Sequence, residues 1–265
     1  FRYYLVIGGM PAAVQKFLDT KDIRQVVEVQ KKILVDYRKD ITQYDEKNSL
    51  RIRAVFDRLA PELNKKNKRF FAGNLDETSR FDRLEDEFVW LKEAGVAIPS
   101  YSVSDPKVPL VLSQKPTFFK LFMNDVGLLA AMYMDGIQLR IVNGEQEINF
   151  GAVYENVVAQ ELKAHGFEPN YYNSKERGEV DFVIEDSGTV LPIEVKCGKH
   201  YARHRALNNL LADTEYAFPR AIVFDDDALK TDGRKFYAPV YMAMFLHKTE
   251  LPEKMVCDLG TPIQF

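Results

Sequence analysis

The stretch that decides the fold is GEVDFVIEDSGTVLPIEVKCGK, Gly178–Lys199. Two runs rich in Val and Ile flank the polar segment EDSGT, which predicts a β-hairpin whose turn takes a positive φ at Gly188. Each run holds an acid among apolar residues, Asp181 in the first and Glu194 in the second, and Lys196 follows two positions later. Because strand side chains at i and i+2 share a face, Glu194 and Lys196 are expected to point the same way.

Pairing of these two predicted strands brings the carboxylate of Asp181 beside that of Glu194. Adjacent carboxylates repel one another, which raises the pKa of at least one of them. A hard divalent cation, Mg²⁺ or Mn²⁺, relieves the repulsion and needs only one or two protein carboxylates together with water and phosphate. Lys196 would then act on a water molecule or on charge at phosphorus, so the hairpin predicts metal-assisted phosphodiester hydrolysis.

The chain around the hairpin alternates between helical and extended patterns. A helix is predicted at 151–165 and another at 201–214. Strands are predicted at 168–173, 179–184, 191–198 and 220–225, with a further apolar segment at 236–245. This alternation indicates an α/β sheet covered by helices.

The first 135 residues are instead mostly helical. Apolar residues recur at helical spacing in four segments, 11–20, 22–41, 50–66 and 76–96. Strands are predicted at 96–103 and in PLVLS (109–113), and 117–133 reads as strand, turn and helix. Helices followed by two strands are the order of a winged helix. Residues 136–150 lack helical period and hold two glycines, so they are expected to form a linker.

Asp181, followed after the hairpin turn by Glu194-Val195-Lys196, resembles the PD-(D/E)XK nuclease motif. Gly178-Glu179 stand where a proline often precedes the aspartate of that motif, so this part departs from the pattern. The order of the predicted elements also resembles the αβββαβ core of these nucleases, over about residues 150–245. The resemblance implies that Asp181 and Glu194 bind the metal and that Lys196 is catalytic.

The helix before the hairpin extends this resemblance. The segment GAVYE, Gly151–Glu155, is similar to the GxxxE opening of resolvase-like members, in which the helical glutamate is a further acidic ligand. Glu155 is therefore expected to join the metal site and the catalytic set. Glu161, about two turns along nearly the same face of the helix, is a second possible ligand.

The first half resembles a more particular family. YYLVIGGMPAAV (3–14), the winged-helix stretch and KLFMNDVGLLAA (120–131) are similar to prokaryotic proteins with an N-terminal AAA+ ATPase module. A domain of unknown function, built from a winged helix and a PD-(D/E)XK-like fold, follows that module. The resemblance implies that the ATPase module precedes this sequence, which contains no GxxxxGK[ST] motif. It divides the chain into a winged-helix-like domain (1–135), a linker (136–150), a nuclease-like domain (151–248) and a tail (249–265).

Two groups of basic residues are candidates for contact with DNA phosphates. One lies in the stretch 47–69 and includes Arg51 and Arg53; the other follows the hairpin and comprises Lys199, Arg203 and Arg205. The alternative for the first group is a solvated helix face. The whole chain carries 36 basic and 39 acidic residues, a net charge of −3, and this overall charge does not indicate binding to nucleic acid.

The remaining composition restricts the setting and leaves three functions open. Two distant cysteines provide no disulfide framework, and no apolar run reaches transmembrane length, so a cytoplasmic protein without membrane contact is expected. The leading function is a Mg²⁺-dependent nuclease-like module of an ATPase-linked protein. The alternatives are a catalytically inactive interaction or regulatory module and a winged-helix DNA-binding regulator.

Overall fold

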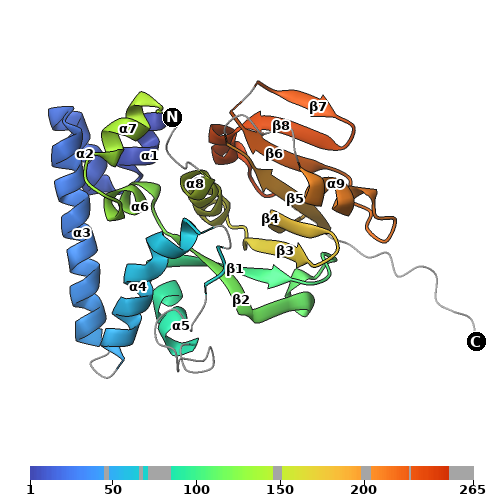
Figure 1. Ribbon diagram of the computed structural model, residues 1–265, viewed down its shortest axis with the longest axis horizontal. Helices are drawn as coiled ribbons and strands as arrows, with labels where there is room; N and C mark the ends of the chain where they lie inside the picture. The colour runs from blue at the N-terminus through green and yellow to red at the C-terminus, as the bar shows by residue number, and fades with distance from the viewer. Residues whose placement is uncertain are drawn as a thin grey trace, which may run out of the picture.

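The computed structural model describes residues 1–44, 48–65, 68–70, 85–145, 151–197, 204–226 and 228–250. Helices from the first half of the chain stand beside a large sheet, and helix α8 lies between them and the sheet (Figure 1). The protein is thus mixed α/β, with a mostly helical N-terminal part.

The N-terminal helices expose polar faces and bury apolar stripes. In the long helix α3 the buried positions Val26, Gln30, Leu34 and Ile41 recur every three to four residues or in multiples of that spacing, which places them on one side. Pro11 opens α2 at the first helical position, where its missing N–H is not needed. The helices are α1 (Arg2–Ile7), α2 (Pro11–Thr20), α3 (Ile23–Tyr44), α4 (Ser49–Leu63), α5 (Glu85–Glu93), α6 (Val126–Met132) and α7 (Ile137–Asn143).

One eight-stranded mixed sheet, in the order β2-β1-β3-β4-β5-β6-β8-β7, unites the two halves of the chain. Strand β1 pairs antiparallel with β2 and parallel with β3, so residues 97–123 share a sheet with the hairpin of the second half. The strands are β1 (Ala97–Val103), β2 (Gln114–Met123), β3 (Asn170–Ser174), β4 (Gly178–Asp186), β5 (Thr189–Val195), β6 (Ala221–Asp225), β7 (Lys230–Asp232) and β8 (Lys235–Pro239).

The predicted hairpin is confirmed as β4 and β5. Asp186 pairs with Thr189 across a two-residue turn. Both turn residues, Ser187 and Gly188, have positive φ (51° and 73°), as a type I′ turn requires. The turn therefore fixes the register of every residue along the two strands.

Two helices cover opposite faces of the sheet. Helix α8 (Gly151–Ala164) packs with Phe182 and Ile193 in the larger apolar core, which also includes the N-terminal helices. Helix α9 (Arg205–Ala212) packs with Val183 and Val223 in a second core. Two 3₁₀ helices, η3 (Leu110–Ser113) and η5 (Val240–Phe245), complete these elements.

Two local predictions were wrong, and one segment was only partly predicted. PLVLS forms helix η3 rather than a strand, since Pro109 precedes it and Val111 and Leu112 are both exposed, without the alternation of a strand. Part of the expected linker forms α7, bounded by Gly136 and Gly144 in left-handed conformations. The segment after β6 adds a short antiparallel pair, β7 and β8, of which only part was predicted.

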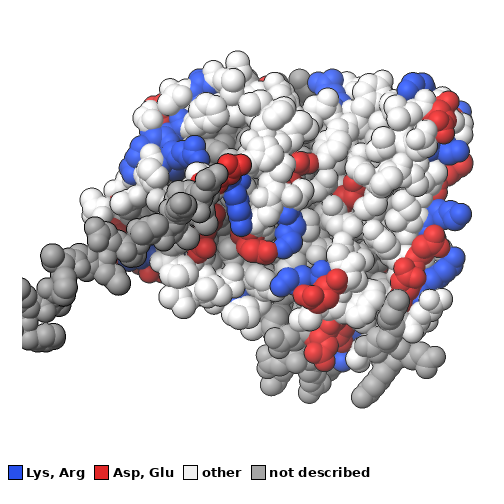
Figure 2. All heavy atoms as spheres, turned by 180° about the vertical axis from the view of Figure 1, so that it is seen from behind, with Lys and Arg blue, Asp and Glu red and all other residues white. Residues whose placement is uncertain are grey.

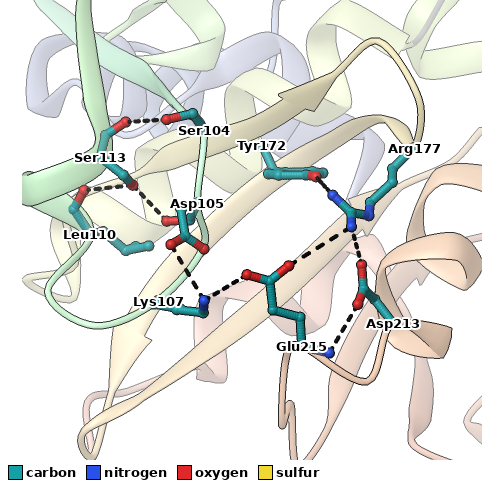
Figure 3. Close-up of polar contacts among 9 residues, drawn as sticks. All are labelled: Ser104, Asp105, Lys107, Leu110, Ser113, Tyr172, Arg177, Asp213 and Glu215. Carbon is teal, nitrogen blue, oxygen red and sulfur yellow. Dashed lines mark hydrogen bonds and ion pairs between the residues drawn. The ribbon is translucent and has the colours of Figure 1, made fainter.

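A polar network ties the β1–β2 connection to the second half of the chain (Figure 3). Lys107 Nζ lies 2.9 Å from Glu215 Oε1, and Arg177 forms an ion pair with Asp213. Arg177 also lies 4.0 Å from Glu215. Because Lys107 and Glu215 are about half exposed, solvent screens their attraction, so the shared sheet carries most of the attachment.

Helices α1, α3 and α6 meet at a closely packed junction. Gln30 Nε2 donates to the carbonyl oxygens of Val6 and Ile7 at 2.8 and 2.9 Å, which satisfies the end of α1. Asp125 caps α6 by accepting from the Leu128 N–H at 2.8 Å, and it also accepts from Gly9 N–H at 2.6 Å. The turn at Gly8 and Gly9, which follows α1, is therefore held by side chains from two other segments.

In the part of the chain that the structure describes, no helix is long and apolar enough to cross a membrane.

Candidate functional site

A β-bulge sets the position of Asp181. One residue of β3, Tyr171, lies opposite two residues of β4, Asp181 and Phe182. Bulges of this kind redirect a side chain and interrupt regular pairing. The β4–β5 ladder begins at Phe182 and Ile193, and Asp181 Oδ2 instead accepts a hydrogen bond from the Val195 N–H at 2.8 Å. The Asp181 carboxylate is thereby fixed beside the end of β5.

Glu194 and Lys196 occupy that end of β5. The register of the hairpin sets Glu194 opposite Asp181, one step beyond the last paired residues. Glu194 is buried, with 4% exposure, whereas the side chain of Lys196 is 27% exposed. Their side chains form an ion pair, as the i, i+2 spacing predicts. Burial of one partner and exposure of the other leave the ammonium able to reach solvent.

Helix α8 supplies the third carboxylate. Glu155 is 5% exposed and forms an ion pair with Lys68, which follows helix α4 in the first half of the chain. Lys68 belongs to the basic stretch that was expected to face either DNA or solvent, and here it contacts a carboxylate instead. Its ammonium is therefore part of the candidate site.

A buried lysine that the sequence analysis did not single out completes the group. Lys120 of β2 is 1% exposed, and its Nζ lies 2.8 Å from Glu179 Oε1. The same atom lies 3.8 Å from Glu155 Oε2 and 4.0 Å from Asp181 Oδ1. These seven residues form what we call the charge cluster: Lys68, Lys120, Glu155, Glu179, Asp181, Glu194 and Lys196.

The charge cluster shifts the titration of its members. Burial and the nearby Asp181 carboxylate raise the pKa of Glu194 to about 8, against the smaller effect of Lys196. Burial and Asp181 also raise the pKa of Glu155, against the lysines around it. Burial alone would lower the pKa of Lys196, but Glu194 and Asp181 outweigh it and the pKa is raised. The carboxylates thus repel one another as the hairpin sequence predicts.

Two buried carboxylate oxygens in the cluster lack hydrogen bonds. Neither Glu155 Oε2 nor Glu194 Oε2 has a hydrogen-bond partner among the residues described. Unsatisfied buried acceptors are rare in folded proteins, and such groups are ordinarily satisfied by an ordered water, a cation or a polar ligand. Among the residues that the structure describes, no group of three or more His, Cys, Asp or Glu side chains is arranged as a metal site.

The raised pKa of Glu194 predicts a specific dependence of stability on pH. Its pKa is about 8 in the folded protein against 4.5 as its ordinary value, so the folded state retains the proton between these limits. The associated stability is full below about pH 4.5 and is lost as the pH rises through about 8. In metal-free buffer, the unfolding free energy from urea denaturation should fall over this range more steeply for wild type than for Glu194→Gln. Parallel curves for the two proteins would contradict the assignment.

The structure does not bring Glu161 to the other carboxylates. It lies six positions after Glu155, about 1.7 helical turns, and so faces a different side of α8. Its Oε1 accepts a hydrogen bond from Tyr4 Oη of α1 at 2.6 Å. The expectation that both glutamates share nearly the same face was wrong because six residues are not two full turns.

The expected DNA-contacting residues are placed only in part. Arg51 pairs with the buried Glu87 at 3.2 Å, whereas Arg53 and Arg205 are exposed. Lys199 and Arg203 lie outside the described residues. On the face seen in Figure 2, basic and acidic side chains are interspersed. Such mixing gives weaker long-range attraction for a polyanion than a single-sign stripe would.

Fold and site together define a mixed α/β protein with a buried carboxylate–lysine cluster where two sequence regions meet. The chain belongs to the family described as Domain of unknown function (DUF8612), which matches residues 1–140, just over half of its length. Residues 150–241 match a second family, Domain of unknown function (DUF4143), commonly the C-terminal region of AAA-ATPase-associated proteins. No curated protein and no solved structure matches the chain.

Proposed function

We propose that the charge cluster is a divalent-cation site for phosphodiester hydrolysis in DNA, in a PD-(D/E)XK-like domain. The observation that carries the proposal is the pair of buried, unsatisfied oxygens on Glu155 and Glu194 beside the Asp181 carboxylate. Carboxylate oxygens are the ligands that Mg²⁺ and Mn²⁺ prefer, so the donor set fits such an ion. Asp181, Glu194 and Glu155 would hold it.

The residues of the cluster divide the work of such a reaction. A bound divalent ion would supply Lewis acidity and a more acidic water. Asp181 is held rigidly by the Val195 N–H, which keeps its second oxygen directed into the cluster. Lys196, partly exposed, can leave Glu194 and place its ammonium against a phosphate oxygen. The chain's own contribution is therefore to orient the carboxylates and to stabilise negative charge.

The same proposal places the domain in a larger, cytoplasmic prokaryotic protein. The match of residues 150–241 to a region common in AAA-ATPase-associated proteins supports an ATPase module as its partner. Helices α4 and α5 with strands β1 and β2 would correspond to the winged-helix part, here joined edge to edge with the nuclease-like sheet. DNA is the proposed substrate, approached from the partly exposed side of Lys196.

One observation favours a second candidate, a catalytically inactive regulatory or interaction module. Three carboxylates of the cluster each have a lysine: Glu155 pairs with Lys68, Glu179 with Lys120 and Glu194 with Lys196. A cluster in which lysines offset the charge of the carboxylates can hold two segments of the chain together specifically, without any catalysis. A test must therefore separate cation binding from structural pairing.

Calorimetric titration of the metal-free protein with Mn²⁺ makes this separation. Wild type should bind Mn²⁺, and Asp181→Ala should weaken the binding at least about tenfold, because a ligand is lost. Asp135→Ala is the matched control, since Asp135 is exposed and its Oδ1 lies 2.5 Å from Lys31 Nζ. If folded wild-type protein takes up no Mn²⁺, or if Asp181→Ala binds as well as wild type, the regulatory candidate replaces the enzyme.

A further inference from the structure

The buried lysine of β2 belongs to a different family match from the carboxylates around it. Lys120 lies within residues 1–140, whereas Glu155, Glu179 and Asp181 lie within residues 150–241. The pairing of β1 with both β2 and β3 brings these segments into one sheet. The charge cluster is thus assembled from both parts of the chain, and the first half supplies a cation to the acids of the second.

The ammonium of Lys120 sits where a metal ion would contact several oxygens at once. Three carboxylates approach its Nζ, at 2.8 Å from Glu179, 3.8 Å from Glu155 and 4.0 Å from Asp181. The ring of Tyr171 lies below it, 5.0 Å from the Nζ to the centroid, and adds the negative face of a π system. The surroundings are therefore electronegative on several sides.

This ammonium is held by charge more than by directed hydrogen bonds. Lys120 Nζ is fully buried, and none of its contacts with the described residues has the geometry of a hydrogen bond. Glu155 Oε2, which faces it, is likewise without a hydrogen-bond partner in the described part of the chain. A compact point charge among several carboxylates is the role that lysine fills better than the planar arginine.

We propose that the Lys120 ammonium is a built-in cation that takes the place of one divalent ion. The carboxylate cluster then has room for a single divalent ion, on the side of Glu194 and Lys196. The single ion rests on the proposed function, whereas the built-in cation does not. Removal of the ammonium leaves Glu155, Glu179 and Asp181 close together without their shared positive charge, an arrangement that hard divalent ions occupy.

Lys120→Met tests this proposal because methionine has a similar length and no charge. The variant should bind one more Mn²⁺ per chain than wild type, counted from the electron paramagnetic resonance signal of free Mn²⁺. Its Tm should also rise on addition of Mn²⁺ by more than that of wild type. Lys120→Gln should behave in the same way, and a second change, Glu179→Gln, should remove the extra ion. Lys31→Met, at an exposed ion pair, is the control and should bind as wild type does.

The possible counts distinguish the two proposals. One Mn²⁺ per chain in wild type and two in Lys120→Met support both the proposed function and the built-in cation. No Mn²⁺ in wild type and one in Lys120→Met support only the built-in cation. Equal numbers in the two proteins overturn the built-in cation and leave the proposed function to its own test. If neither Lys120→Met nor Lys120→Gln folds in EDTA or in Mn²⁺, the proposal is also overturned, because Mn²⁺ should replace the missing charge.

Discussion

Lys196→Ala is expected to lower DNA cleavage by about a hundredfold or more while the protein stays folded and still binds Mn²⁺. In the proposed reaction the ammonium stabilises negative charge on phosphate, and an amine is a poor ligand for a hard divalent ion. The side chain is 27% exposed, so its truncation should change the unfolding free energy by no more than about 1 kcal/mol. Cleavage rates, Mn²⁺ calorimetry and urea denaturation measure the three quantities separately.

Two comparisons sharpen this prediction. Lys163→Ala removes a lysine that pairs with the exposed Glu168, and it should cleave as wild type does. Asp181→Ala should lose cation binding and cleavage together, so the two inactive variants differ in their metal content. If wild type cleaves DNA and Lys196→Ala cleaves it equally fast, the proposed role of Lys196 is wrong.

Gly127→Ala should lower the unfolding free energy by about 3 kcal/mol. A Cβ built at Gly127 would lie 2.6 Å from Gly8 N, 2.6 Å from the Ile7 carbonyl carbon and 2.6 Å from Gln30 Nε2. Two of these atoms belong to the backbone at the end of α1, which cannot move without loss of the Gln30 and Asp125 hydrogen bonds. The better helix propensity of alanine, about 1 kcal/mol, is smaller than this effect.

Gly95→Ala is the matched control for that clash. Gly95 has a φ of +67°, and within the described structure no atom other than those of Gly95 and its two chain neighbours lies within 4 Å of a Cβ built there. Its replacement introduces only the strain of a left-handed residue, about 1 kcal/mol. Chemical denaturation of both variants compares the two losses. A Gly127→Ala protein no less stable than Gly95→Ala would show that the α1–α6 junction yields easily.

The hairpin was predictable because its signals are local. Alternating apolar residues and the turn around Gly188 fix the register of β4 and β5, and that register sets Asp181 opposite Glu194. The bulge opposite Tyr171 was not predictable, since it depends on pairing with β3 rather than on the sequence of β4. Local pattern thus located the acids, and long-range pairing determined how their side chains are held.

The partners of those acids were missed for the same reason. Lys120 pairs with residues at least 35 positions away, and nothing near it in the sequence announces them. One signal was nevertheless present: Lys120 interrupts an apolar run between Phe119 and Leu121, as Asp181 and Glu194 interrupt theirs. A charged residue in an otherwise apolar strand is therefore a signal for a buried partner of opposite charge.

The parallel pairing of β1 with β3 has a consequence for any attempt to divide the protein. Tyr101 to Val103 pair with Asn170 to Tyr172 across the boundary between the two family matches. Separation between residues 140 and 150 would leave unpaired amides and carbonyls along both strands, and such edges recruit strands from other molecules. Each half made alone would therefore tend to self-associate. Although two families match the chain, the two matched segments need to be produced as one polypeptide.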